Sequence, residues 1–314
     1  MAAQYFADEN ARRNYLIKTI IGKVFLYLFI TIFALFILTP FIFMVWGSFV
    51  DKDAFKTFTE TGDFSKLAQL SINNYADIFS NSYKNPLDGS VTPRPSFAQY
   101  FLNTFIVAIS STLVTVVTAV LAAFAFARLE FKGKDALFAS LLATMMIPGE
   151  MMVITNYQTT IQLDWKFTFS ALIFVHGVSV FYIFYLRQAF QQIPNELYLA
   201  AKVDGVNDFE YLIKVMIPIA MPTIVTILIL SLMGSWNSYI WPTLVANGSW
   251  KYNKDYNMQL VSNGLMSLFS SEVSSGYDAV KIAGSMVVTA PLFVFFLIFR
   301  EYIMRGVSRS GIKG

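Results

Sequence analysis

The chain has 314 residues, of which 56% are hydrophobic and 14% are charged, whereas soluble globular proteins carry about 25% charged residues. This composition excludes an ordinary soluble domain and indicates a protein embedded in a bilayer. The formal net charge is +3 and there is no cysteine and one histidine, which excludes a basic surface for nucleic acid, disulfide frameworks, thiol catalysis and zinc-peptidase sites.

Long apolar runs predict the membrane-spanning helices. A helix needs about 20 apolar residues to cross a bilayer. Six runs meet this requirement: Val24 to Trp46, Thr104 to Ala127, Ala136 to Ile154, Phe167 to Phe184, Ile217 to Trp236 and Ile282 to Phe299. The first run is longer than the roughly 7 to 15 residues of a signal-peptide core, so we expect a retained helix. The sequence therefore predicts an all-α membrane domain over residues 24–304, between a segment 1–23 and a tail 305–314.

The positions of lysine and arginine predict the orientation, because short cytoplasmic flanks are enriched in positive charge. With the N-terminus inside, the cytoplasmic flanks would hold most of the positive side chains of the short segments: Arg12, Arg13, Lys18, Lys23, Arg128, Lys132, Lys134, Arg187, Lys202, Lys214, Arg300, Arg305, Arg309 and Lys313. We expect both termini to be cytoplasmic. The segments 51–96 and 242–281 are then long outer loops.

A polar insert with a helical pattern separates the fourth and fifth runs. Pro194 suits a first helical turn, and Glu196 lies near the positive end of the helix dipole. Asp204-Gly205 predicts a turn, since glycine tolerates positive φ. Asn207 with Glu210 three residues later resembles a capping box. The pattern predicts a helix, a glycine turn and a second short helix within residues 189–217.

Small and apolar residues recur at helical spacing in the first of these helices. Ile193, Leu197, Ala200, Ala201 and Asp204 predict a narrow stripe that another backbone could approach closely. An ordered helix pair in such a position has little purpose unless something docks on it.

The insert resembles the cytoplasmic loop of binding-protein-dependent ABC importer permeases. Their signature is Glu-Ala-Ala, three residues, Gly, and then an apolar-Pro pair. Ala200, Ala201, Gly205 and Ile217-Pro218 fall on this motif, while Leu199 stands where the motif has its Glu. The salt bridge of that carboxylate is therefore not expected, although Glu196 keeps an upstream acidic position.

Further motifs are similar to the sugar-importing, maltose-permease branch of this family. They are Asn103-Thr104, Met146-Ile147-Pro148 with Glu150, Phe184 to Gln188 with Ile193-Pro194, Trp236-Asn237, Trp241-Pro242, Gly306 and Gly311-Ile312-Lys313-Gly314. The resemblance implies the type I importer permease fold, with six transmembrane helices and a coupling helix in the loop 189–217. It also implies an inner-membrane protein of a prokaryote that carries a sugar or oligosaccharide.

The same resemblance implies partners: a second permease, often a different chain, two ATPase subunits and an extracytoplasmic solute-binding protein. The residues expected to couple to the ATPase are Glu196, Leu199, Ala200, Ala201, Asp204 and Gly205. No G-x-x-x-x-G-K-[ST] phosphate loop occurs in the chain, so we expect it to hold no cofactor and to catalyse no reaction. ATP and Mg²⁺ would be bound by the ATPase subunits.

Polar and aromatic residues within apolar segments are candidates for the substrate pathway. They are Glu150, Asn156, Trp236, Asn237, Tyr239 and Trp241. A charge such as that of Glu150 is costly in a membrane unless it faces a cavity, although it could instead cap a helix break beside Pro148-Gly149. The tryptophans and tyrosine could stack on a sugar or form an interfacial belt. His176 is expected to make a hydrogen bond between helices.

Alternative functions stay open at this point. The cargo could be another solute, such as glycerol phosphate, a polyol or an amino acid. An ion-coupled secondary transporter would use buried ionisable groups and often has duplicated halves, neither of which is prominent here. A membrane-embedded enzyme or scaffold is the third class.

Overall fold

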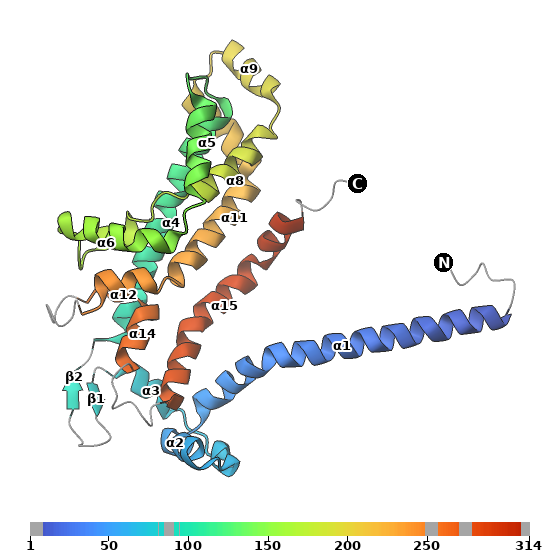
Figure 1. Ribbon diagram of the computed structural model, residues 1–314, viewed down its shortest axis with the longest axis vertical. Coiled ribbons are helices and arrows are strands. Elements are labelled where there is room, and N and C mark those ends of the chain that lie inside the picture. Colours follow the sequence, from blue (N-terminus) through green and yellow to red (C-terminus); the bar gives the residue numbers. More distant parts are fainter. Residues whose placement is uncertain are drawn as a thin grey trace. The chain divides into compact units, whose positions relative to one another are not determined.

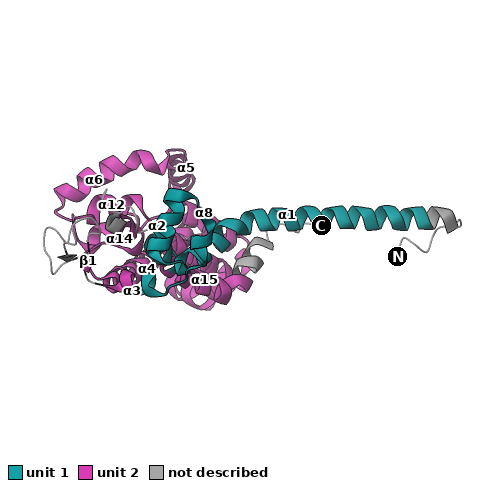
Figure 2. Ribbon diagram, turned by 90° about the horizontal axis from the view of Figure 1, so that it is seen from below, with its two compact units in different colours: residues 1–75, 276–286 teal, residues 76–275, 287–314 magenta. Residues whose placement is uncertain are grey.

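The computed structural model describes residues 9–80, 82–84, 91–93, 95–248, 257–269 and 278–308. The chain forms two compact units, which Figure 2 shows in different colours. Unit 1 comprises residues 1–75 and 276–286, and unit 2 comprises residues 76–275 and 287–314.

Unit 1 is built on a long apolar helix, α1 (Glu9–Phe49), followed by α2 (Lys52–Thr61) and the short 3-10 helix η2 (Phe64–Ala68). The Asp51 carboxylate caps α2 by accepting from the backbone N–H groups of Asp53 and Ala54 at 3.0 and 3.3 Å. Behind this cap, Val50 and Phe55 pack in a small buried cluster. The cap and the cluster together fix where α1 ends and α2 begins.

Unit 2 is organised around α4 (Phe97–Arg128), against which α8 (Val180–Gln191) and α11 (Ile217–Trp236) pack along much of their length (Figure 1). Small or slender side chains at every fourth position of α4 are buried, and this row lets neighbouring helices approach closely. The row consists of Val107, Ser111, Thr115, Ala119 and Ala123.

The described residues form further elements, of which α15 has 31 residues and begins in unit 1. They are α3 (Asn73–Phe79), β1 (Ser82–Lys84), β2 (Val91–Pro93), α5 (Lys134–Thr144), η3 (Gly149–Met152), α6 (Val153–Gln162), α7 (Phe169–Ile173), α9 (Asn195–Val203), α10 (Asp208–Tyr211), the π-helical turn η4 (Leu212–Met216), α12 (Ile240–Ala246), α14 (Val261–Phe269) and α15 (Asp278–Ser308). The strands β1 and β2 pair antiparallel.

The predicted all-α membrane architecture is confirmed. Among the described residues, four helical segments are long and apolar enough to cross a membrane: Arg13–Phe49, Phe97–Arg128, Asp208–Trp236 and Asp278–Glu301. They contain the first, second, fifth and sixth predicted spans. The domain boundaries at residues 23/24 and 304/305 stay predictions.

The third predicted span is a bent pair of helices. Lys134–Thr144 and Gly149–Gln162 meet at an angle of 89°. Pro148, which has extended backbone angles, stands at the start of η3 and disfavours helical geometry in the residue before it. The break predicted beside Pro148-Gly149 is therefore present, and the predicted range Ala136 to Ile154 crosses it.

The fourth predicted span, Phe167 to Phe184, was wrong as a single helix. It contains α7, an irregular stretch and the start of α8. Thr168 and Ser179 begin the two helices by accepting from backbone N–H groups with their side chains. Between them the carbonyl of Gly177 accepts from the hydroxyl of Thr118 on α4 at 2.8 Å. Hydrogen bonds to side chains thus compensate for the interrupted helix, which hydrophobicity alone could not predict.

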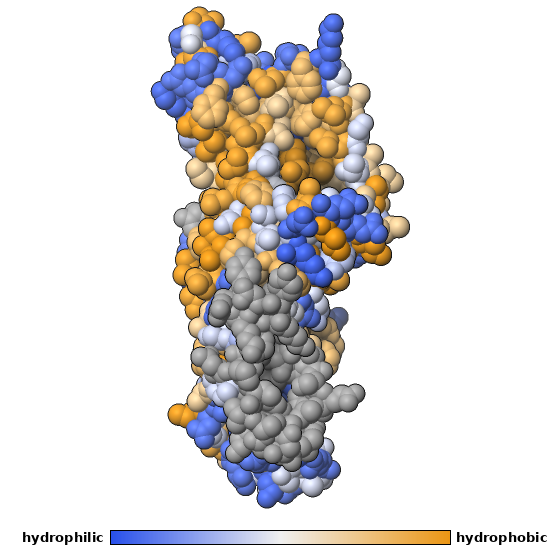
Figure 3. Space-filling model, turned by 90° about the vertical axis from the view of Figure 1, so that its left-hand side faces the viewer, coloured by the Kyte–Doolittle hydropathy of each residue, from blue (hydrophilic) through white to orange (hydrophobic). Residues whose placement is uncertain are grey.

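Figure 3 shows the hydropathy of one face of the molecule. Hydrophobic residues gather below a hydrophilic end, and α9 lies at that end in Figure 1. An apolar surface next to a polar end matches the requirement of a lipid-facing protein.

Gly177 provides a test of this packing. A Cβ atom at this position would lie 2.7 Å from Cγ1 of Val114 and 3.2 Å from the carbonyl oxygen of Phe174. We expect Gly177→Val to destabilise the protein by about 1 to 3 kcal/mol, because overpacking forces the helices apart. The measurement is thermal unfolding in detergent. Gly22→Val, where the added Cβ meets no atom within 4 Å, is the matched control, and equal melting temperatures for the two variants would contradict the close approach.

Candidate functional site

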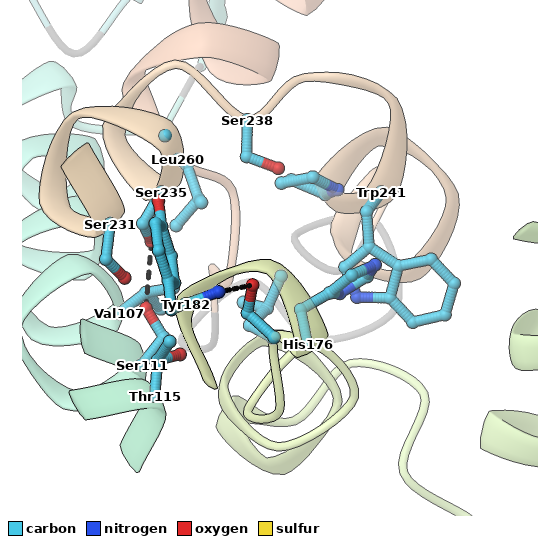
Figure 4. A pocket seen from close by; sticks show the side chains of 14 residues that line it. Val107, Ser111, Thr115, His176, Tyr182, Ser231, Ser235, Ser238, Trp241 and Leu260 are labelled. Carbon is cyan, nitrogen blue, oxygen red and sulfur yellow. Dashed lines mark hydrogen bonds between the residues drawn. The ribbon is translucent and has the colours of Figure 1, made fainter. Parts of the chain in front are cut away.

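A cavity of about 240 Å³ lies within unit 2 (Figure 4). Hydroxyl groups from several elements face it. The polar and aromatic lining residues are Ser111 and Thr115 of α4, Ser179 and Tyr182 at the start of α8, Ser231 and Ser235 of α11, and His176, Ser238 and Trp241 from the connecting segments and α12.

Helical spacing explains why these hydroxyls converge. Ser111 and Thr115 are four residues apart, as are Ser231 and Ser235, so each pair lies on one face of its helix. The hydroxyls of Ser111 and Ser235 lie 2.9 Å apart in a hydrogen bond between α4 and α11. This hydrogen bond joins two walls of the cavity, as Figure 4 shows.

An aromatic side chain forms another wall. The indole Nε1 of Trp241 donates to the carbonyl oxygen of Ala171 at 2.9 Å, which fixes the orientation of the ring. The His176 ring lies edge-on to it, with 5.2 Å between the ring centroids. The hydrogen bond expected of His176 is not among the described contacts, and the ring contact with Trp241 is what the structure shows instead.

Of the six predicted pathway residues, Trp241 alone lines this cavity. Trp236 is buried against Phe105, with 5.1 Å between the ring centroids. The exposed Asn237 caps the end of α11 by donating to the carbonyl of Met233, and Tyr239 is exposed. Substrate contact by these residues, and the interfacial belt weighed for Trp236 and Tyr239, stay predictions.

Glu150 and Asn156 lie on the bent segment. Glu150 is exposed in η3, directly after the break, and Asn156 is partly exposed on α6. Neither lines the cavity. Their proposed contact with a substrate stays a prediction.

Sequence reasoning missed most of the hydroxyl lining. Ser231, Ser235 and Ser238 escaped notice because serine is common in membrane helices and each residue alone is uninformative. The signal that could have found them is the pairing of hydroxyls four residues apart, once on α4 and once on α11.

The chemistry of the cavity is neutral. Its lining contains hydroxyls, one indole and one imidazole, and none of the lining residues is Asp, Glu, Lys or Arg. Within the described part of the chain, no group of three or more His, Asp or Glu residues could hold a metal ion. Hydroxyls both donate and accept hydrogen bonds, and an indole face packs well against the C–H face of a sugar ring.

The loop 189–217 forms the second candidate site. α9 follows Pro194, as predicted, and ends before Gly205, whose φ is +76°. The side chain of Asn207 caps α10 by accepting from the N–H of Glu210 at 2.8 Å. The Glu210 carboxylate pairs with Lys214. The predicted helix, glycine turn and helix are confirmed.

A side-chain cluster holds the two helices of the loop together. Asp208 Oδ1 accepts from the Tyr198 hydroxyl at 2.7 Å and from Lys202 Nζ at 2.6 Å. The hydrogen bond to Asp208 raises the pKa of Lys202, whereas burial and then Asp208 raise the pKa of Tyr198. Because 43% of the Lys202 side chain and 41% of the Asp208 side chain are exposed, water screens this ion pair and it contributes little to stability.

The two faces of α9 differ from the predicted stripe. Tyr198 and Ala201 pack inward against the core of unit 2, whereas Leu199, Ala200 and Val203 are exposed. The predicted stripe is therefore only partly buried: Ala201 packs against the core of unit 2, whereas Ala200 and Asp204 of the same stripe are exposed. The exposed coupling candidates are Glu196, Leu199, Ala200, Asp204 and Gly205.

The outward face of this loop is unusually apolar. Val203 is 88% exposed, Phe209 65% and Leu199 57%. We call Leu199, Val203 and Phe209 the apolar tip. Large apolar side chains exposed on a polar segment are typical of a docking surface.

Comparison with known proteins gives the family context. The sequence model of the family described as "Binding-protein-dependent transport system inner membrane component" matches residues 11–309. The chain is 27% identical over 245 residues to the arabinooligosaccharides transport system permease protein AraQ of Bacillus subtilis, covering 78% of this chain and 80% of that protein. It is 25% identical to the trehalose/maltose transport system permease protein MalG of Thermococcus litoralis, covering 95% and 99% of the two chains.

A solved structure shares the fold. It is a chain of a bacterial ABC transporter involved in the import of the acidic polysaccharide alginate, with a TM-score of 0.70, 20% sequence identity, and coverage of 95% of this chain and 99% of that chain. At this identity the similarity establishes the architecture alone.

Gly205 provides a test of the loop conformation. A left-handed conformation costs a residue with a side chain about 1 to 2 kcal/mol, so we expect Gly205→Leu to loosen the turn after α9. Hydrogen exchange of residues 198–208 should become faster. Gly133→Leu is the matched control, because Gly133 has a φ of +80° and equally open surroundings but lies between α4 and α5. Unchanged exchange in Gly205→Leu would contradict the requirement for this turn.

Proposed function

Because the chain belongs to the binding-protein-dependent transport system inner membrane components, we propose that it is the permease subunit of an ATP-driven importer for a neutral sugar or oligosaccharide. The chain forms half of the translocation pathway. The observation that carries the proposal is the apolar tip of the loop 189–217, which offers an ATPase subunit a surface to dock on.

The neutral cavity supports a neutral sugar as the cargo. A phosphorylated or carboxylated solute would call for Lys or Arg in the lining, and the lining has neither. Two relatives are transport permeases for arabinooligosaccharides and for trehalose or maltose, which favours a saccharide over an amino acid or glycerol phosphate. A polyol shares the hydroxyl chemistry and is the nearest alternative.

The partners follow from the family. A second permease completes the pathway, two ATPase subunits bind and hydrolyse ATP with Mg²⁺, and an extracytoplasmic binding protein delivers the sugar. Both termini and the loop 189–217 lie in the cytoplasm in this proposal, in agreement with the positive charge of the short flanks. The permease itself binds no nucleotide.

The loop converts closure of the ATPase subunits into movement of the helices. Glu196, Leu199, Ala200, Asp204 and Gly205 lie at the exposed side of α9 and its turn, where a docking cleft can hold them as a rigid body. Ala201 acts from the inner side, by packing α9 onto the core. Alternating access to the cavity then results from shifts among α4, α8 and α11.

The docking role can be tested at Val203. We expect Val203→Glu to reduce the ATPase subunits recovered with the permease by about tenfold or more, because it buries a charge in an apolar contact. The measurement is quantitative copurification from gently solubilised membranes. The matched control is Phe64→Glu, which introduces the same charge at another exposed residue, in η2 of the predicted outer loop 51–96. Full recovery of the ATPase with Val203→Glu would contradict docking at the apolar tip.

The cavity can be tested at Ser235. Leucine at this position would fill the space and remove the hydrogen bond to Ser111, so we expect sugar uptake to fall while ATPase recovery stays at the wild-type level. Thr226→Leu is the control on the same helix, outside the cavity lining.

Uptake of neutral saccharides, of a polyol and of a uronate should be compared in the wild type. Uptake that survives ATP depletion but collapses with the ion gradient would contradict an ATP-driven importer and favour a secondary transporter.

A further inference from the structure

Two parallel helices of unit 2 end at the same level. Three hydrogen bonds join α4 to α8 and to the residues just before α8, and they follow the same direction along both segments: Thr118 with Gly177, Phe126 with Arg187, and Arg128 with Phe190. Their C-terminal ends therefore lie side by side. Each end has carbonyl groups without partners in its own helix and carries partial negative charge, so the two ends repel and need donors.

Arg128, the final residue of α4, supplies these donors to α8. Its side chain is buried, with 8% of its surface exposed. The guanidinium Nη2 donates to the carbonyl oxygens of Phe190, at 2.9 Å, and Ile193. Among the described residues it has no ion pair with a carboxylate, so these backbone carbonyls at the negative end of α8 are what stabilise its charge.

Arg187 of α8 makes the opposite connection. Its Nε donates to the carbonyl oxygen of Phe126 in the last turn of α4 at 3.1 Å, and its guanidinium lies over the Phe138 ring at 4.0 Å. Each helix thus has an arginine that donates a hydrogen bond to the C-terminal end of the other helix.

The hydrogen bond to Ile193 lies within the loop 189–217, directly before the start of α9. Ile193 is buried and is followed directly by Pro194, the cap of α9. Without the hydrogen bond from Arg128 to Ile193, the short connection between α8 and α9 could bend, and a displacement of α9 would not move α8 or α4. This hydrogen bond holds the start of α9 to the C-terminal end of α4. About 20 Å back along α4 from Arg128, Thr115 lines the cavity.

We propose that Arg128 is a positioning residue that holds α4, α8 and α9 together as one rigid body. Movement of α9, docked on an ATPase subunit, is then transmitted to the wall of the cavity. This inference rests on the proposed ATP-driven function. Arg128 touches neither nucleotide nor substrate. It differs from a residue needed only for folding because its loss should separate nucleotide binding from movement at the cavity while the subunits still assemble.

The absence of cysteine from this chain allows a direct test. Gly234 lines the cavity, and a Cβ there meets no atom within 4 Å, so Gly234→Cys is a suitable reporter. The complete importer, carrying this reporter in proteoliposomes, is labelled with a methanethiosulfonate reagent without nucleotide and after trapping with ATP and vanadate. The readout is the ratio of the two labelling rates on this chain.

In the reporter background alone we expect this ratio to differ from 1. With Arg128→Met we expect it to return to about 1, while ATPase recovery and ATP hydrolysis persist. Lys132→Met is the matched control, because it removes a positive charge from the same flank at an exposed residue and should leave the ratio unchanged. Arg128→Lys keeps the charge but lacks the planar fork, so its response should be reduced with normal assembly.

The outcomes separate the two proposals. A reporter that never responds to nucleotide contradicts the proposed function itself. A response in Arg128→Met equal to that of the reporter alone overturns the positioning role and leaves the function intact. If Arg128→Met does not assemble, Arg128→Lys decides: a full response overturns the inference, and a reduced response in an assembled complex supports it.

Discussion

A backbone group that leaves regular helix inside an apolar chain must find a hydrogen-bond partner within the protein, because lipid offers none. In this structure α4 supplies many of these partners. Thr118 donates to the irregular turn before α8, and Arg128 donates to the end of α8. Asn103 donates to the carbonyls of Asn257 and Gln259, and the hydroxyl of Thr104 accepts from the N–H of Val261 at the start of α14. The central helix is therefore both the packing core and the source of hydrogen bonds that make broken helices possible.

The broken segments are also where the functional features gather. The cavity lies where α7 ends, α8 begins and α11 turns into α12, so that Ser179 and Ser238 can face it from outside regular helix. Continuous helices would present only one face each to such a space. Hydrogen bonds such as that from Trp241 to Ala171 hold the irregular parts in place. A permease needs a polar space within an apolar body, and interrupted helices provide one without exposing backbone groups to lipid.

The loop 189–217 shows a similar division between buried and exposed surfaces. Tyr198 and Ala201 tie α9 to the core of unit 2, and Asp208 links α9 to the following helix. The opposite face, with Val203 at its tip, is left exposed. Gly205 permits the reversal between the two helices through its positive φ. A surface that is rigid from within and apolar on the outside can transmit a push, whereas a flexible loop would absorb it.

The amino-acid sequence alone predicts the membrane class, the all-α architecture, the positions of α1, α4, α11 and α15, and the order of elements in the loop 189–217. Long apolar runs, Gly205 and the Asn207 cap carry these features locally, so no tertiary contact was needed to read them. Tertiary contacts, by contrast, break the helix predicted from Phe167 to Phe184 and bury Ala201 while Ala200 stays exposed. They also leave five of the six proposed pathway residues outside the cavity and bring Arg128 to Ile193. These features depend on which backbone group or side chain of a distant segment lies opposite, and neither hydrophobicity nor spacing along one helix contains that information.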